Sequence, residues 1–236
     1  MVFSNPAGRE DASLSCRASL LDNVRTNTAF ALCVAMSLFH LYTAGIGLLQ
    51  TPVQRAVHVG FVLVLVFLLY PLRRGWHWAD VLLVLCSIAG TGYIALFSDV
   101  IALRGGKVLP YELVLGTLPL AAVLEAGRRV LGRTLPLLGL AFLLYCRYGR
   151  YAPSIFMHRG YSLERIVQHM YLTTEGVFGV AVGVSSTFIF LFILFGAYLE
   201  STGLGKFFID LANALAGWAS GGPAKVAVLS SGLMGT

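Results

Sequence analysis

The residues best suited to chemistry lie near the end of the sequence, where small and hydroxyl-bearing residues interrupt an apolar stretch. Ser230, Ser231, Gly235 and Thr236 follow the break made by Gly221-Gly222-Pro223. Hydroxyl and backbone oxygens at such a break are ligands that a re-entrant membrane helix can offer to an ion or a substrate. The small and hydroxyl-bearing residues of this stretch are therefore typical of a broken or re-entrant helix whose backbone could coordinate an ion, and their types alone leave the ligand open.

Enzyme chemistry is disfavoured by the rest of the sequence. It contains no H-E-x-x-H, no G-x-S-x-G and no phosphate-binding loop. The four cysteines are far apart and lack metal-binding spacing, so we predict neither a catalytic group nor a metal site. His40 and His58 lie within apolar runs, where we favour a packed or interface role over proton transfer. The sequence thus predicts a protein that is not an enzyme.

Three glycines form a second pattern, with spacing that suits helix packing. Gly176, Gly179 and Gly183 lie on or near one face of a predicted helix over 176–199, and the last two make a G-x-x-x-G step. Ser185, Ser186 and Thr187 follow and could mark a polar point on a transport path. We favour helix packing, with the hydroxyl groups bonded to their own backbone.

These residues must be positioned by helices that cross a lipid bilayer. Of the 236 residues, 57% are hydrophobic and 12% are charged, and the mean hydropathy is +0.79. Soluble domains carry about 25% charged residues. A helix needs about 20 mainly apolar residues to cross the hydrocarbon core. Four runs reach or approach that length, at 28–49, 56–72, 81–97 and 176–199.

Shorter segments complete an all-α, polytopic prediction of about six spanning helices. The runs at 113–124 and 135–146 are expected to be tilted, kinked or shielded spans. Residues 162–172 predict a capped amphipathic helix that could lie on the membrane surface, and residues 207–218 predict a short apolar-rich helix. The stretch from 221 onward is expected to begin a re-entrant hairpin. Since it is too short to cross, we expect the sequence to be the N-terminal part of a longer protein.

Charged residues predict the orientation of the chain. The Lys and Arg of the N-terminal segment and of the second and fourth connections outnumber those of the first and third, which favours a cytoplasmic N-terminus. The connection over 147–175 departs from this pattern. Glu125 and Asp99 are expected at helix ends, beside Arg128 and Arg104 respectively. The net charge of +6 is thus assigned to topology, and no nucleic-acid partner is predicted.

The stretch over 162–236 resembles the fused permease of tripartite ATP-independent periplasmic (TRAP) transporters, of the TAXI-associated type. Upstream, "LEAGRRVLGRTLPLLGLAFLLY" and "HRGYSLERI" are similar to the same family, while residues 1–90 match in hydropathy alone. The segments that carry the resemblance are Tyr171-Leu172-Thr173-Thr174-Glu175-Gly176, Phe195-Gly196-Ala197, Phe207-Phe208-Ile209-Asp210-Leu211-Ala212 and Gly221-Gly222-Pro223-Ala224-Lys225.

The resemblance implies a division of the chain into four parts. They are a cytoplasmic segment at 1–26, a small-component-like four-helix domain at 27–132, a linking helix and connection at 133–160, and the start of the large transport component at 161–236. In that family the large component carries the substrate and ion sites on re-entrant hairpins. The remainder of that component is therefore expected as a partner, with Ser230, Ser231, Gly235 and Thr236 at the edge of the site.

The resemblance also implies a function and a location. It points to symport of a small organic solute with a cation, usually Na+, across the bacterial inner membrane, with no tightly bound cofactor. A TAXI-type periplasmic binding protein would deliver the solute. Two alternatives stay open: a permease of another transporter class, and a membrane scaffold without transport activity of its own.

Overall fold

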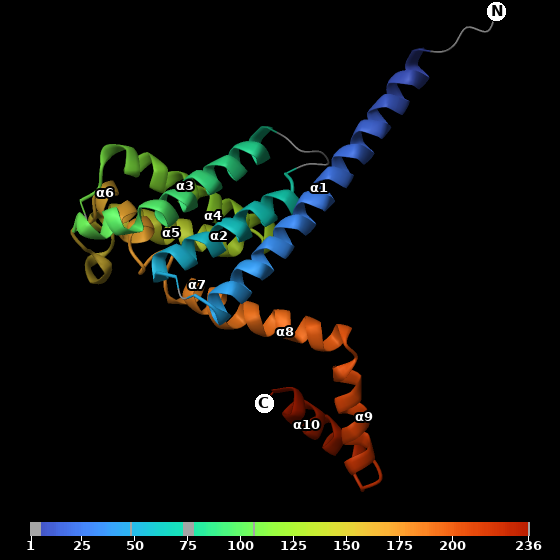
Figure 1. The fold of residues 1–236 in the computed structure, drawn as a ribbon. Helices are drawn as coiled ribbons and strands as arrows, with labels where there is room; N and C mark the ends of the chain where they lie inside the picture. Colours follow the sequence, from blue (N-terminus) through green and yellow to red (C-terminus); the bar gives the residue numbers. More distant parts are fainter. Residues whose placement is uncertain (1–5, 48, 73–77, 106, 236) are drawn as a thin grey trace, which may run out of the picture. The chain divides into compact units, whose positions relative to one another are not determined.

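The computed structural model describes residues 6–47, 49–72, 78–105 and 107–235. Every regular element within these ranges is a helix, which confirms the predicted all-α class (Figure 1). The chain forms two compact units, residues 1–186 and residues 187–236. The division falls inside the last of the long apolar helices.

Among the described residues, four helices are long and apolar enough to cross a membrane, and they correspond to the four long apolar runs. The first candidate span, Asn23–Gly45, belongs to the longer helix α1 (Pro6–Gly45). The second and third are α2 (Thr51–Leu69) and α3 (Trp78–Leu103), which has a kink at Phe97. The fourth, Val180–Ser201, joins α7 (Val180–Val184), a π-helical turn and α8 (Phe190–Ser201).

The last span begins at Val180, four residues after the predicted start. The backbone before it folds back, and the Val177 amide donates to the Met170 carbonyl at 2.9 Å. Gly179 then has an extended conformation, with φ −73° and ψ −170°, and caps α7. The helix does not extend back to Gly176, because the extended backbone at Gly179 lies outside helical geometry.

Both shorter apolar runs are helical and longer than predicted. They form α4 (Pro110–Val130) and α5 (Thr134–Tyr148). Neither is among the candidate spans, so the predicted total of about six spans stays a prediction. Pro119 lies inside α4 and packs on α3, where a Cβ added to Gly90 would lie 2.7 Å from its Cγ atom.

The core of the first unit is built around α2, which packs against α1, α3 and α4 (Figure 1). In the most apolar stretch of α2, 39% of the residues are buried, compared with 22% in the corresponding stretches of α1 and α3. Its buried residues repeat at helical spacing and face α3, α4 and the segment after α5. The members of the main core cluster on α2 are Ala56, Val59, Leu63 and Phe67.

The predicted amphipathic helix over 162–172 forms, and one face of it packs against the protein core, whereas its position on a membrane surface stays a prediction. It consists of α6 (Leu163–Val167) and a π-helical turn over Gln168–Leu172, and the Ser162 hydroxyl accepts a hydrogen bond from the Arg165 amide at 3.2 Å. Val167 and Tyr171 are buried in the core, and the Tyr171 hydroxyl donates to the Gly90 carbonyl at 2.7 Å. These two side chains therefore do not face a membrane surface.

The second unit ends in a helical hairpin (Figure 1). Its arms are α9 (Leu204–Ala216), with 13 residues, and α10 (Gly222–Gly235), with 14. Gly203 and Gly221 have φ values of 76° and 74°, which only glycine adopts readily, and they make the turns before the two helices. Ala212, Ala216 and Val226 are buried between the arms. Each arm is shorter than the about 20 residues that span a bilayer.

Candidate functional site

The four predicted ligands lie on α10 and at the end of the sequence. The Ser230 hydroxyl donates to the Ala227 carbonyl of the same helix at 3.2 Å, and Ser231 is exposed. Gly235 ends α10, and Thr236 lies outside the described residues. The structure thus places the two serines on one arm of the hairpin, and their role as ligands stays a prediction.

A cavity of about 500 Å³ also lies in the second unit, between α8 and α9. Its walls are mainly apolar and include Phe192, Phe195 and Ile209, with Glu200 and Lys206 as the charged members. The predicted α10 ligands are not part of its lining. The cavity therefore adds no residue to the predicted ligands.

The three predicted packing glycines differ in their surroundings. A Cβ at Gly176 would lie 2.3 Å from the Met170 Cα, and one at Gly179 would lie 2.8 Å from the Gly176 carbonyl oxygen. Both glycines therefore permit the tight turn before α7, and they do not lie on the helix itself. Gly183 does lie on α7, and a Cβ there would lie 2.6 Å from Nη2 of Arg55. Of the three glycines, Gly183 is therefore the one at which a residue of another helix, α2, comes close.

The first half of α2 carries polar side chains that hold the segment 178–186. Gln54 Nε2 donates to the Ser186 carbonyl at 3.4 Å, and Arg55 Nη1 donates to the Phe178 carbonyl at 2.8 Å. One turn later, His58 Nε2 lies 3.1 Å from Ser185 Oγ. Such hydrogen bonds between apolar helices stabilise helix association in membranes. Three polar residues within five positions of an apolar run were the signal in the sequence for this contact, which sequence reasoning missed.

His40 on α1 and His58 on α2 are buried and bonded to each other. His40 Nε2 lies 2.9 Å from His58 Nδ1, and His40 Nδ1 lies 2.7 Å from the Met36 carbonyl oxygen. Their exposed fractions are 1% and 5%. This arrangement agrees with the favoured interface role. Within the described parts of the chain, no group of three or more His, Cys, Asp or Glu could hold a metal ion.

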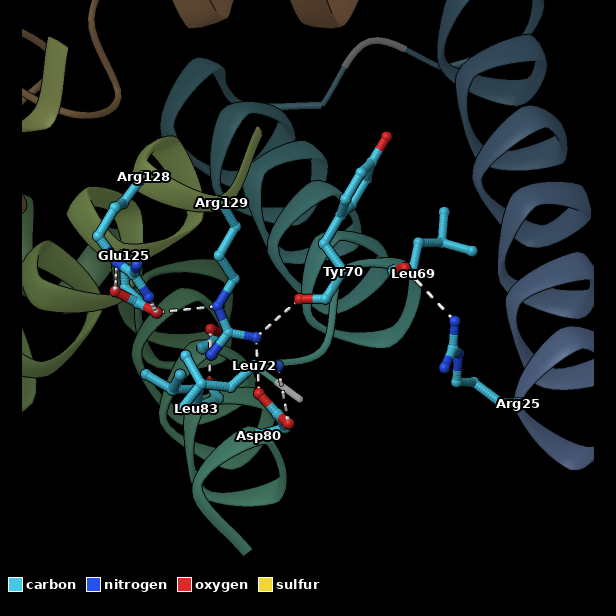
Figure 2. Close-up of polar contacts among 10 residues, drawn as sticks. Arg25, Leu69, Tyr70, Leu72, Asp80, Leu83, Glu125, Arg128 and Arg129 are labelled. Carbon is cyan, nitrogen blue, oxygen red and sulfur yellow. Dashed lines mark hydrogen bonds and ion pairs between the residues drawn. The ribbon is translucent and has the colours of Figure 1, made fainter. Parts of the chain in front are cut away.

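An ion-pair network ties together the ends of α2, α3 and α4, as Figure 2 shows. Arg129 Nη1 lies 2.6 Å from Asp80 Oδ1 and donates to the Tyr70 carbonyl at 2.9 Å. Arg129 Nε donates to Glu125 at 2.9 Å, and Asp80 also accepts a hydrogen bond from the Leu72 amide. The Asp80 side chain is fully buried and that of Arg129 is 5% exposed. The network therefore fixes how three helix ends meet.

Glu125 lies beside Arg128 as predicted, whereas the position of Asp99 beside Arg104 stays a prediction. Arg128 donates two hydrogen bonds of 2.7 Å to Glu125, and this guanidinium lowers the pKa of the Glu125 carboxyl below its ordinary value. Asp99 accepts from Gln50 Nε2 at 2.8 Å. Arg104 pairs at 2.8 Å with Glu112, which is fully buried. A buried carboxylate needs a cation more than an exposed one, because it has lost its hydration.

The helices and their polar contacts define a multi-pass helical membrane protein. Residues 118–236, half of the chain, match the family described as Tripartite ATP-independent periplasmic transporter, DctM component, and the chain belongs to that family. No curated protein and no solved structure matches the chain. The matched part begins within α4 and includes α5 and all later helices.

Family membership decides two of the predictions. The family consists of membrane permeases, so the prediction that the protein is not an enzyme is confirmed. Membership also makes the protein a multi-pass membrane component of a TRAP transporter, a family that is typically cation-coupled. Such a component works with a periplasmic binding protein and with other TRAP components.

Proposed function

We propose that this chain is the permease part of a TAXI-associated TRAP transporter, which takes up a small organic solute by symport with Na+. The observation that carries the proposal is the DctM match over residues 118–236. The segments around Tyr171 and Gly221 that resemble the TAXI-associated type support the finer assignment. A TAXI-type binding protein then delivers the solute at the outer face of the bacterial inner membrane.

We further infer that a small-component-like domain at 27–132 is fused, through residues 133–160, to the large component that starts at 161. The contact between α2 and the segment 178–186 supports this arrangement, because it bonds the first part of the chain to the start of the large component. Four helices, α1 to α4, precede the linking region. In this arrangement the first part of the chain serves as a scaffold.

We assign Ser230, Ser231, Gly235 and Thr236 to the edge of the substrate or ion site. The support is the α9–α10 hairpin, whose arms are each shorter than a membrane span. Such short helices end within the bilayer when they enter it, and their terminal backbone groups are then available to ligands. Neither Na+ nor a solute needs a further cofactor in this proposal.

Uptake by membrane vesicles tests the proposed function. Right-side-out vesicles from cells with and without the gene would receive periplasmic extract and a panel of radiolabelled organic acids. We expect uptake that requires both the gene and the extract, follows an imposed Na+ gradient and continues without ATP. Uptake that needs ATP and ignores the gradient would favour a permease of another class. Unchanged uptake without the gene would favour a scaffold that has no transport activity of its own.

A further inference from the structure

One line of hydrogen bonds crosses three helices through two buried histidines. It runs from the Met36 carbonyl to His40 Nδ1 at 2.7 Å, and from His40 Nε2 to His58 Nδ1 at 2.9 Å. It ends at Ser185 Oγ, 3.1 Å from His58 Nε2. Ser185 starts the π-helical turn within the last candidate span, and single π-turns in membrane helices often mark functional positions. The line therefore joins α1 and α2 to the start of the proposed large component.

The Met36 carbonyl at the start of this line determines which atom donates in each of its hydrogen bonds. A carbonyl oxygen only accepts, so His40 Nδ1 carries the hydrogen. In a neutral imidazole the other nitrogen is then an acceptor, and the hydrogen between the two rings comes from His58 Nδ1. By the same rule His58 Nε2 is an acceptor and the Ser185 hydroxyl donates to it. Both rings thus carry their hydrogen on Nδ1.

We propose that His40, His58 and Ser185 form a binding site for a single proton, which is taken up at Nε2 of His58. The gap of 2.9 Å between the rings holds one hydrogen, and a second would set two N–H groups against each other. His58 Nε2 faces a hydroxyl oxygen, which can accept as well as donate. The added proton therefore reverses the bond to Ser185, whose hydrogen turns toward a carbonyl of the preceding helical turn.

The groups around the site determine what a bound proton does. Thr43 lies next to it on α1 and donates from its hydroxyl to the His40 carbonyl. Gln54 and Arg55 lie on α2, and Ser186 lies beside Ser185. The charged group among these is the Arg55 guanidinium, which holds the Phe178 carbonyl. A second positive charge at His58 is repelled by Arg55 across apolar surroundings, so proton binding weakens the hold of α2 on residues 178–186.

Nitrogen NMR of the purified chain in lipid nanodiscs tests this site directly. The five histidines, labelled with nitrogen-15, would be assigned with single His→Gln variants and titrated from about pH 8 to about pH 3. We expect both rings to carry hydrogen on Nδ1 at the higher pH. On acidification the pair gains one proton, seen at His58 Nε2. A hydrogen on Nε2 in both neutral rings, or two protons taken up by the pair, would overturn the proposal.

Two serine variants on the same candidate span sharpen the test. Ser185→Ala removes the hydroxyl that faces His58, so we expect the titration midpoint of His58 to shift. Ser201→Ala is the matched control, because the Ser201 hydroxyl bonds to the Tyr198 carbonyl of its own helix. Equal midpoints in both variants would contradict the assigned role of Ser185. The wild-type spectrum decides the tautomers without any variant, and no part of the test depends on transport.

Discussion

At the scale of single residues, Asp80 forms a buried ion pair with Arg129. The carboxylate is fully buried, and Arg129 also bonds to the Tyr70 carbonyl and lies 5.0 Å from the centre of the Phe67 ring. Breaking a buried ion pair by removing one partner typically costs about 3–5 kcal/mol. The neighbouring pair of Arg128 with Glu125 is partly exposed, and such pairs contribute about 0–1 kcal/mol.

We therefore predict that Arg129→Met destabilises the protein far more than Arg128→Met. Thermal unfolding in detergent, followed by the loss of monodisperse protein, measures both variants. The double variant Arg129→Met with Asp80→Asn should recover part of the loss, because it removes the buried carboxylate that Arg129 pairs with. Equal melting temperatures for the two single arginine variants would refute a special role of the Arg129 pair.

The two ion pairs also show what a single sequence can predict about residue contacts. Arg128 follows Glu125 by three positions on one predicted helix, so their contact follows from helical geometry alone. Asp80 and Arg129 are 49 positions apart, and their contact depends on how α3 packs against α4. The bonds of His40 to His58 and of His58 to Ser185 depend on packing in the same way. The polar residues were visible in the sequence, whereas their partners were not.

At the scale of elements, α3 and α4 approach each other where Gly90 faces Pro119. The proline ring is rigid, and a Cβ at Gly90 would lie 2.7, 3.0 and 3.1 Å from three of its carbon atoms. The Gly90 carbonyl also accepts the hydrogen bond from buried Tyr171. The absence of a side chain at this position therefore lets three elements meet. Two residues later on the same helix, a Cβ added to Gly92 would have nothing within 4 Å.

Alanine at these two glycines should consequently have opposite effects. We predict that Gly90→Ala destabilises the first unit by about 1–3 kcal/mol, the usual cost of overpacking. Gly92→Ala should be neutral or stabilise by up to about 1 kcal/mol, because alanine favours helix. Melting temperatures of the two variants in the same detergent measure the difference. A tolerated Gly90→Ala would contradict the close approach of α3 and α4.

The packing role predicted for Gly183 has its own matched control. Gly183→Leu would displace the Arg55 guanidinium and break its bond to the Phe178 carbonyl, so we expect lower stability. Gly196 lies on the same candidate span, and a Cβ added there would have nothing within 4 Å. Gly196→Leu should therefore be tolerated. Limited proteolysis near residues 173–179 should increase in the Gly183 variant only. Similar digestion of both variants would remove Gly183 from the packing contact.

Length and hydropathy predicted the long helices, because crossing a bilayer demands one long apolar run for each span. They were less informative where the protein supplies the surroundings itself. Residues 176–179 read as part of the last span, yet they form a turn bonded to Met170. The amphipathic pattern of residues 162–172 predicted the helix, but it did not indicate that Tyr171 is buried against α3. Each place depends on a tertiary contact, and a local sequence pattern does not indicate such a contact.

At the scale of the whole molecule, the function proposed here depends on orientation. A binding protein delivers its solute from the periplasm, so the connections of the permease must face defined sides. Lys and Arg near helix ends prefer the cytoplasm. The connection between α2 and α3 carries Arg73 and Arg74, and the one between α4 and α5 adjoins Arg128, Arg129 and Arg133. The connection between α3 and α4 contains Arg104, whose charge is paired with Glu112, and Lys107.

We accordingly predict that Arg74 lies on the cytoplasmic side and Lys107 on the periplasmic side. The four native cysteines would first be replaced by serine, and a single cysteine would then be placed at either position. In intact cells with a permeable outer membrane, an impermeant thiol reagent should label Lys107→Cys and spare Arg74→Cys until the inner membrane is opened. The two positions lie on either side of α3, so a single crossing of that helix predicts opposite labelling. The reverse pattern would invert the orientation, and labelling of both in intact cells would mean that α3 does not cross.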